Sequence, residues 1–322
     1  MRLSPAKRRL LALGLLLALS PLGTYADTTA PAAAPPPPPP AIDRSLFDYD
    51  RAAAPPVKTI GVETKDGVAV ADVELAGAHA DDRPVKAYLV RPAAGSDRPL
   101  AAVLWVHWLG EPSTTNRTQF LDEATALAGD GVVSLLVDTM WAEPGWYRNR
   151  RFDRDRADSI AQVVALRRAL DVLLGQPGVD PTRAAIVAHD YGAMHSAILA
   201  GVDPRVPNFV FIAGTPSLLD WAFYVAKPES MEAYVAAMHA VELKDYLAHT
   251  SHATFLHQYA EHDYYVPLAK ALEFFTATAG RKQLAVYSGA SHAMTEVPAI
   301  RLDRTVWLRR QLKLPAATTS SP

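Results

Sequence analysis

The chain has 322 residues, of which 49% are hydrophobic, and its formal net charge at pH 7 is −2. A chain of this length can bury a sizeable core, and its near-neutral charge balance gives no indication of a nucleic-acid partner. Cysteine is absent, which excludes a thiol nucleophile and a cysteine-based metal site.

The first 26 residues have the pattern of a secretory signal peptide. A basic stretch ends at Arg9, an apolar run extends from Leu10 to Leu19, and Thr24 and Ala26 place small residues at the −3 and −1 positions of a cleavage site. The apolar run is shorter than the roughly 20 residues that span a bilayer. We therefore expect residues 1–26 to be removed and the protein to be exported, periplasmic or secreted, with no membrane span after signal removal.

The segment 27–56 is rich in alanine and proline, with an unbroken proline run from Pro35 to Pro40. This composition favours an extended linker rather than a packed element. The segment 57–316 is predicted to form one domain, and 317–322 a disordered tail.

Apolar runs and amphipathic stretches alternate through the predicted domain. Alternating residues predict early antiparallel strands, and near-continuous apolar runs predict the buried strands of a parallel sheet. The antiparallel strands are expected at Val68–Leu75 and Val85–Val90, the parallel strands at Ala101–Val106, Val132–Val137, Ala184–Val187, Phe209–Ala213, Thr254–Tyr259 and Gln283–Tyr287, and helices at Ser159–Leu174 and Leu268–Ala279. This order predicts an α/β fold with a doubly wound, mostly parallel sheet and a small helical insertion at 217–249.

Ligands of such sheets bind beyond the carboxyl ends of the strands. Residues that directly follow the predicted strands are therefore candidates for contact with a small-molecule substrate. The aromatic and ionisable residues expected to line that site are His107, Trp141, Trp146, Trp221 and Tyr264.

The segment from Ala188 to Gly192 lies between a predicted strand and a predicted helix. It has the small-x-nucleophile-x-small pattern of a nucleophile elbow, with Asp190 at the nucleophile position. A carboxylate can act in covalent catalysis, and the helix N-terminus favours its ionised form. The simpler interpretation is that Asp190 caps the helix.

Two further residues complete a catalytic set with Asp190. Asp263 and His292 each follow a late predicted strand, in the chain order nucleophile, acid, histidine. The expected oxyanion-hole donors are the backbone N–H of Tyr191 and that of Trp108 or Leu109.

Other candidates have weaker support. Ser291 stands in a second elbow-like motif, but no histidine lies downstream of that motif. The histidines at 249, 252, 257 and 262 lack metal-ligand spacing, so neither a metal nor a cofactor is predicted. For an epoxide substrate, tyrosine donors would be needed, and the insertion offers Tyr224, Tyr234 and Tyr246.

From about residue 57 onward, the chain resembles the dienelactone-hydrolase-like branch of the α/β-hydrolase superfamily. The motifs that carry the resemblance are Val106–Gly110, Ser134–Trp141, Val179–Arg183, the elbow, Asp263–Pro267 and Ser291–Met294. The resemblance implies an α/β-hydrolase fold and a hydrolase acting on a small ester or lactone. The aspartate in the elbow is instead similar to haloalkane dehalogenases and epoxide hydrolases, with Tyr191 where their elbow often has tryptophan.

Three hypotheses on function remain open at this point. The motifs around the elbow indicate an esterase or lactonase, in which Asp190 and His292 can also position water directly. The carboxylate indicates attack on an sp³ carbon, since its attack on an ester would form a high-energy mixed anhydride. A binding protein on a hydrolase scaffold is the third, because a fold does not determine function. The sequence does not indicate an oligomeric state.

Overall fold

The computed structural model describes residues 38–51, 55–77 and 83–315. The predicted signal peptide, the start of the predicted linker and the predicted tail at 317–322 lie outside the described residues. The elements that follow belong to the unit formed by residues 39–322. Within the described ranges, no helix is long and apolar enough to cross a membrane.

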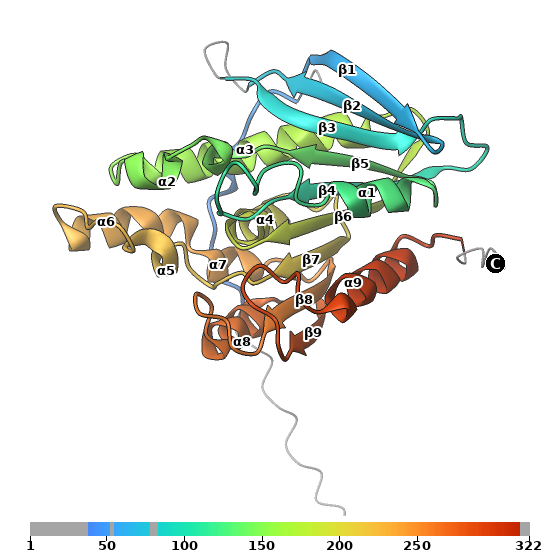
Figure 1. Cartoon of the computed structure of the whole chain (residues 1–322). Coiled ribbons are helices and arrows are strands. Elements are labelled where there is room, and N and C mark those ends of the chain that lie inside the picture. Colours follow the sequence, from blue (N-terminus) through green and yellow to red (C-terminus); the bar gives the residue numbers. More distant parts are fainter. Residues whose placement is uncertain (1–37, 52–54, 78–82, 316–322) are drawn as a thin grey trace, which may run out of the picture. The chain divides into compact units, whose positions relative to one another are not determined.

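A nine-stranded sheet in the described residues has the order β1-β2-β3-β5-β4-β6-β7-β8-β9 (Figure 1). Its strands are β1 Val57–Lys65, β2 Val68–Leu75, β3 Val85–Pro92, β4 Leu100–Val106, β5 Val132–Val137, β6 Val179–His189, β7 Asn208–Ile212, β8 Thr254–Ala260 and β9 Arg281–Tyr287. Pairing is antiparallel from β1 to β3 and between β3 and β5, and parallel from β5 through β9. The strand order reverses at β4, so the crevice at the carboxyl ends of β4 and β6 is where such a sheet binds ligands.

Helices cover both faces of this sheet. One hydrophobic cluster contains residues of α3 (Asp155–Leu174), α4 (Tyr191–Val202), α7 (Leu243–Leu247) and α8 (Leu268–Ala277), and the other contains residues of α1 (Leu121–Ala128) and α9 (Pro298–Gln311). Strand β4 supplies both: Leu104 and Val106 join the first cluster, whereas Val103 and Trp105 join the second. This division follows from the alternation of side chains along a strand.

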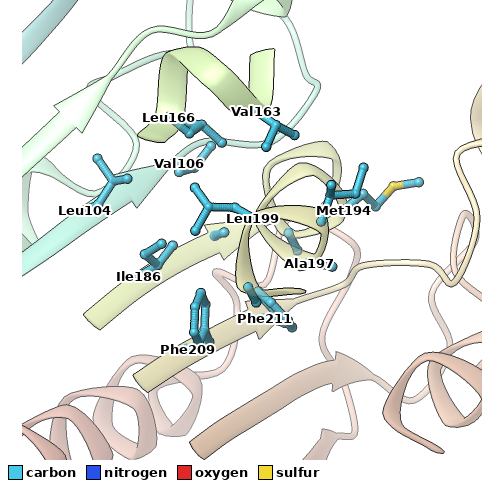
Figure 2. Packing of buried hydrophobic residues seen from close by; sticks show 14 of the residues in the cluster. Leu104, Val106, Val163, Leu166, Ile186, Met194, Ala197, Leu199, Phe209 and Phe211 are labelled. Carbon is cyan, nitrogen blue, oxygen red and sulfur yellow. The ribbon is translucent and has the colours of Figure 1, made fainter. Parts of the chain in front are cut away.

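Figure 2 shows part of the first cluster, where side chains of α3 and α4 pack on those of the central strands. Val163 and Leu166 come from α3, and Leu199 from α4, while Ile186 and Phe209 come from β6 and β7. Every residue of α4 is buried. The helix that follows Asp190 is therefore held rigidly against the sheet.

Short elements complete the fold. They are η1 Arg44–Phe47, η2 Met140–Ala142, α2 Trp146–Asn149, α5 Leu219–Ala222, α6 Met231–Met238 and η3 His239–Val241. The predicted insertion at 217–249 thus consists of α5, α6, η3 and α7. Its last helix packs into the core beside α4, through Leu243 and Leu247, and only its first part approaches the candidate site described below.

The folded unit begins ahead of the predicted boundary at 57. Phe47 is fully buried, with its ring edge-on to Tyr246 at a centroid distance of 5.6 Å. The Tyr49 hydroxyl donates a hydrogen bond to Asp171 of α3 at 2.8 Å. The interpretation of 27–56 as an unpacked linker is therefore wrong for its last part, because the aromatic residues after the proline run add to the core.

Candidate active site

Asp190 lies at a sharp turn between β6 and α4. Its φ angle is +53°, a left-handed conformation that a residue with a side chain adopts at a cost of about 1–3 kcal/mol. Two residues later, a Cβ on Gly192 would lie 2.7 Å from the backbone oxygens of Val106 and His107. The glycine therefore permits α4 to approach β4, and the turn presents the Asp190 carboxylate at the carboxyl end of the sheet.

The two carboxylate oxygens of Asp190 have different surroundings. Oδ2 accepts a hydrogen bond from the Leu109 N–H at 3.1 Å. Oδ1 is fully buried and accepts no hydrogen bond from the described residues. Asp190 occupies the N-cap position of α4, as the simpler interpretation has it, but its side chain makes no capping hydrogen bond to the helix.

His292 faces Asp190 and is held from behind by Asp263. Its Nδ1 donates a hydrogen bond to Asp263 Oδ2 at 2.8 Å, and its Nε2 lies 3.9 Å from Asp190 Oδ1. Asp263 Oδ1 in turn accepts from the N–H groups of Tyr265 and Val266 at 2.8 and 3.0 Å. The structure thus brings together the three residues predicted from the sequence, with the acid fixed by its own turn and the imidazole fixed by the acid.

The charges of this group are coupled. Burial lowers the pKa of His292, but the carboxylates of Asp190 and Asp263 outweigh it and raise that pKa to about 9. Burial also raises the pKa of Asp190, against the opposing effects of His292 and of the Tyr191 and Leu109 N–H groups. With His292 protonated at neutral pH, the ion pair favours the ionised form of Asp190 although its side chain is fully buried.

The two loop donors predicted after β4 differ in their partners. The Leu109 N–H reaches Asp190, whereas the Trp108 N–H donates to the Gln119 side chain at 3.0 Å. The Trp108 N–H therefore does not face Asp190. The N–H groups that do are those of Leu109 and Tyr191, the first residue of α4, and both lower the pKa of Asp190.

A cavity of about 560 Å³ opens onto His292 and onto the loop 108–112 that follows β4, which we call the oxyanion loop. Seven of its sixteen lining residues are tryptophan or tyrosine, and two glutamates and one arginine also line it. The lining residues are Trp108, Leu109, Gly110, Glu111, Pro112, Trp141, Glu143, Gly145, Trp146, Tyr147, Arg148, Trp221, Tyr224, Val225, Tyr265 and His292. Such a wall suits a largely apolar ligand of modest size.

Of the residues predicted to line the site, Trp141, Trp146 and Trp221 do so. His107 does not: it is buried below the loop, where its Nε2 accepts a hydrogen bond from the Thr139 N–H at 3.2 Å. Tyr264 does not either, because its side chain is 85% exposed and points away from the cavity wall that the adjacent Tyr265 lines.

Several wall residues were not among those predicted to line the site. Tyr147 and Arg148 belong to the short helix α2, and Tyr265 stacks on Trp221 at a centroid distance of 5.4 Å. The clustering of aromatic residues after the strand ends was the available signal, but it did not indicate which of two neighbouring tyrosines faces inward.

The tyrosines proposed as epoxide donors separate into two groups. Tyr224 lines the cavity. The Tyr234 hydroxyl instead donates to Asp155 and the Tyr246 hydroxyl to the Ala240 carbonyl, so both have structural partners outside the cavity.

The remaining candidates are accounted for. Ser291 donates its hydroxyl to Glu296, on the outside of the loop that carries His292. Within residues 38–51, 55–77 and 83–315, no group of three or more histidine, aspartate or glutamate side chains is arranged to hold a metal ion. His257 is buried in β8 among aromatic rings.

Several hydrolases are among the solved structures that share this architecture. Acetyl xylan esterase 1 from Thermoanaerobacterium sp. JW/SL YS485 aligns with a TM-score of 0.65 at 13% identity, over 82% of this chain and 91% of its own. An S-formylglutathione hydrolase from Agrobacterium tumefaciens gives 0.60 at 15% identity, over 79% and 99%. A cold-adapted esterase from an Arctic intertidal metagenomic library gives 0.56 at 19% identity, over 78% and 97%.

These likenesses, together with the strand order, define the structure as an α/β-hydrolase fold, as predicted. At such low identity they describe the fold alone. No family model matches the sequence, and no curated protein matches it either.

Proposed function

We propose that the protein is an exported hydrolase in which Asp190 attacks an sp³ carbon and forms an alkyl ester, with His292 and Asp263 hydrolysing that ester. The substrate is a small, mostly apolar molecule with a halide or epoxide oxygen as leaving group. The observation that carries the proposal is the unequal environment of the two Asp190 oxygens: Oδ2 accepts a hydrogen bond from the Leu109 N–H, whereas Oδ1 accepts none and faces His292 Nε2 at 3.9 Å.

The position of Oδ2 distinguishes this chemistry from ester hydrolysis by a nucleophile in the elbow. In acyl transfer, the backbone donors must bind the carbonyl oxygen of the substrate. Here the Leu109 donor is already paired with an oxygen of Asp190 itself. The oxyanion that this donor can stabilise without rearrangement is therefore one that develops on Asp190.

The first step uses Asp190 Oδ1, the oxygen that accepts no hydrogen bond. Oδ1 attacks the sp³ carbon, a new C–O bond forms, and the bond to the leaving group breaks with its electron pair on that group. With an epoxide, the leaving oxygen stays attached to the same molecule and takes a proton from Tyr224, which lines the cavity; the proton that His292 loses after ester formation restores the tyrosine.

The second step regenerates Asp190. Water attacks the Asp190 carbonyl carbon while His292 Nε2 takes a proton from it, and negative charge develops on Oδ2, where the Leu109 N–H stabilises it. Collapse of this intermediate releases the alcohol, which takes the proton from His292, and restores the carboxylate. The net reaction consumes one water and yields an alcohol, a halide ion and a proton from a haloalkane, or a diol from an epoxide.

The charges of Asp190 and His292 determine the order of the two steps. Before attack, the negative charge of Asp190 keeps His292 protonated, because the two groups lie 3.9 Å apart and both are buried. Ester formation removes that charge, so the pKa of His292 falls from about 9 and the ring loses its proton. The histidine thus becomes a general base only when there is an ester for it to hydrolyse.

A second candidate, hydrolysis of a small ester or lactone, is favoured by the names of the structural neighbours, which are largely esterases. In that route Asp190 and His292 would position and activate water without a covalent step. A non-catalytic binding protein on the same scaffold would carry out neither reaction.

One experiment separates these candidates. A panel of haloalkanes, epoxides, aryl esters and lactones identifies a substrate, and a single turnover with excess enzyme in ¹⁸O-water follows. The covalent route places label in the carboxylate of Asp190, detected by mass spectrometry of its peptide, because water attacks the carbonyl carbon of Asp190. Label found only in the product would refute the proposal and support direct attack by water.

The matched control is Asp190→Asn, which retains the shape of the side chain but lacks the nucleophilic oxygen pair. We expect it to lose turnover by on the order of 10³-fold or more, as when members of a catalytic unit are removed singly. A folded Asp190→Asn variant with normal turnover would exclude Asp190 from the reaction.

A further inference from the structure

Gln119 and His189 connect the oxyanion loop to the loop of the proposed catalytic histidine by a continuous chain of hydrogen bonds. The Trp108 N–H donates to Gln119 Oε1 at 3.0 Å, Gln119 Nε2 lies 2.8 Å from His189 Nδ1, and His189 Nε2 lies 2.9 Å from the His292 carbonyl oxygen. These three hydrogen bonds connect residues that are up to 184 positions apart in the sequence, from Trp108 to His292.

The direction of every bond in this chain is determined by its two ends. A backbone N–H can only donate, so Gln119 presents Oε1 to Trp108 and must present its NH₂ group to His189. His189 Nδ1 therefore accepts, and Nε2 carries the hydrogen that it donates to the His292 carbonyl, which can only accept. A neutral His189 with its proton on Nε2 is the state that satisfies all three bonds.

The surroundings of His189 maintain that neutral state. The side chain is 1% exposed, and burial, followed by the charge of His292, lowers its pKa well below 6.5. Its ring stacks on that of Trp108 with an interplanar angle of 8°, and the Trp108 ring also contacts the ring of His292. The His189 ring is therefore held in place by packing as well as by hydrogen bonds.

We propose that Gln119 and His189 are positioning residues that hold the backbone of His292 in register with the oxyanion loop, so that the His292 ring stays aligned between Asp263 and Asp190. Neither residue lines the substrate cavity, so both act on the chemistry only through His292 and Trp108. This inference rests on the proposed role of His292, although its geometric part can be tested without a substrate.

The test uses nuclear magnetic resonance of the full-length protein labelled with ¹⁵N at histidine. In the wild type we expect His189 to show the neutral Nε2–H form, unchanged between pH 5 and 9. We also expect a low-field proton signal from the His292 Nδ1–H bonded to Asp263. A His189 that carries its proton on Nδ1, or that titrates in this range, overturns the proposal.

Two variants of Gln119 and one control extend the test. Gln119→Met removes both side-chain hydrogen bonds, so the low-field His292 signal should broaden or disappear. In Gln119→Glu the carboxylate can accept from both neighbours, so His189 should become doubly protonated while the His292 signal survives. Gln176→Met, which removes a hydrogen bond to the Val172 carbonyl remote from the site, should leave both signals unchanged.

Kinetics with the substrate identified above provide a second measurement. Gln119→Met should lower kcat by about 10- to 100-fold with little change in KM, because the alignment of His292 is lost and the cavity is not. Unchanged kcat together with an unchanged His292 signal would refute the positioning role. If wild-type Asp190 never acquires ¹⁸O label, the proposed function fails, but the histidine signals still show whether the hydrogen bonds through Gln119 and His189 form.

Discussion

The ion pair between His292 and Asp190 leads to a quantitative prediction that needs no substrate: Asp190→Asn will lower the pKa of His292. The pKa of His292 is raised to about 9 by two carboxylates against the opposing effect of burial. One of them, Asp190, lies 3.9 Å from Nε2 and is fully buried. Asparagine retains the side-chain shape and removes only the charge.

The magnitude follows from Coulomb's law. Two unit charges about 4 Å apart interact by roughly 4 kcal/mol at an effective dielectric constant of 20, which corresponds to about 3 pKa units. Part of this is lost because the asparagine amide is still polar and Asp263 remains in place. We therefore expect the pKa of His292 to fall by about 2 units in Asp190→Asn, toward the ordinary value for histidine.

The measurement is a pH titration of the His292 ring by NMR, in the wild type and in Asp190→Asn. Asp153→Asn serves as the control, because Asp153 is an exposed partner of Arg151 on the surface and its charge is screened by solvent. A pKa that stays near 9 in Asp190→Asn would refute the coupling and, with it, the argument that esterification converts His292 into a base.

Four further predictions concern stability, local packing, chemistry and processing. Burial lowers the pKa of His257 to about 3. Below pH 6.5 the unfolded chain binds a proton at this histidine that the folded chain does not bind, so the free energy of unfolding decreases as the pH is lowered. The loss from pH 7 to 5, measured by urea unfolding, should be about 2 kcal/mol smaller in His257→Met. Gly192→Ala should destabilise the fold by about 1–3 kcal/mol in the same assay, since its Cβ meets backbone oxygens, whereas Gly95→Ala, with open space around it, should have little effect. Asp190→Ser should acquire hydrolysis of aryl esters, because it frees the Leu109 N–H; its absence in a folded variant would indicate that the hole cannot accept a substrate oxygen. Protein recovered from the cell envelope or medium should begin at Asp27, and an N-terminus at Met1 would contradict the predicted signal peptide.

Much of the fold could be predicted because its strands are buried on both faces. The run predicted at Val132–Val137 coincides with β5, and the run predicted at Thr254–Tyr259 coincides with β8 except for its last residue. Strand β1 was not found in this way, because it lies at the sheet edge with all of its residues exposed and therefore has no buried face that requires a run of apolar residues. Helices α5 and α7 were likewise too short for a periodic pattern.

The candidate site was predictable in its residues but not in its hydrogen bonds. The order of Asp190, Asp263 and His292 and their places after strands are visible in the sequence, since the sheet brings the carboxyl ends of its strands together. Which backbone donor faces Asp190 was not visible: the sequence offers Trp108 and Leu109 equally, and the choice depends on Gln119, a polar residue in a loop with no motif of its own.

The pairing of Leu109 with Asp190 also explains how one fold can carry either an esterase or an alkyl-transferring hydrolase. The backbone donors are part of the turn and the loop, so they do not change when the nucleophile changes. With a serine, whose single oxygen must attack, the donors are left for an oxygen of the substrate. With a carboxylate, one oxygen attacks while the other occupies the donors, and the charge they stabilise moves from the substrate to the protein. The identity of one side chain at position 190 then determines which carbon becomes tetrahedral, without any change in the surrounding fold.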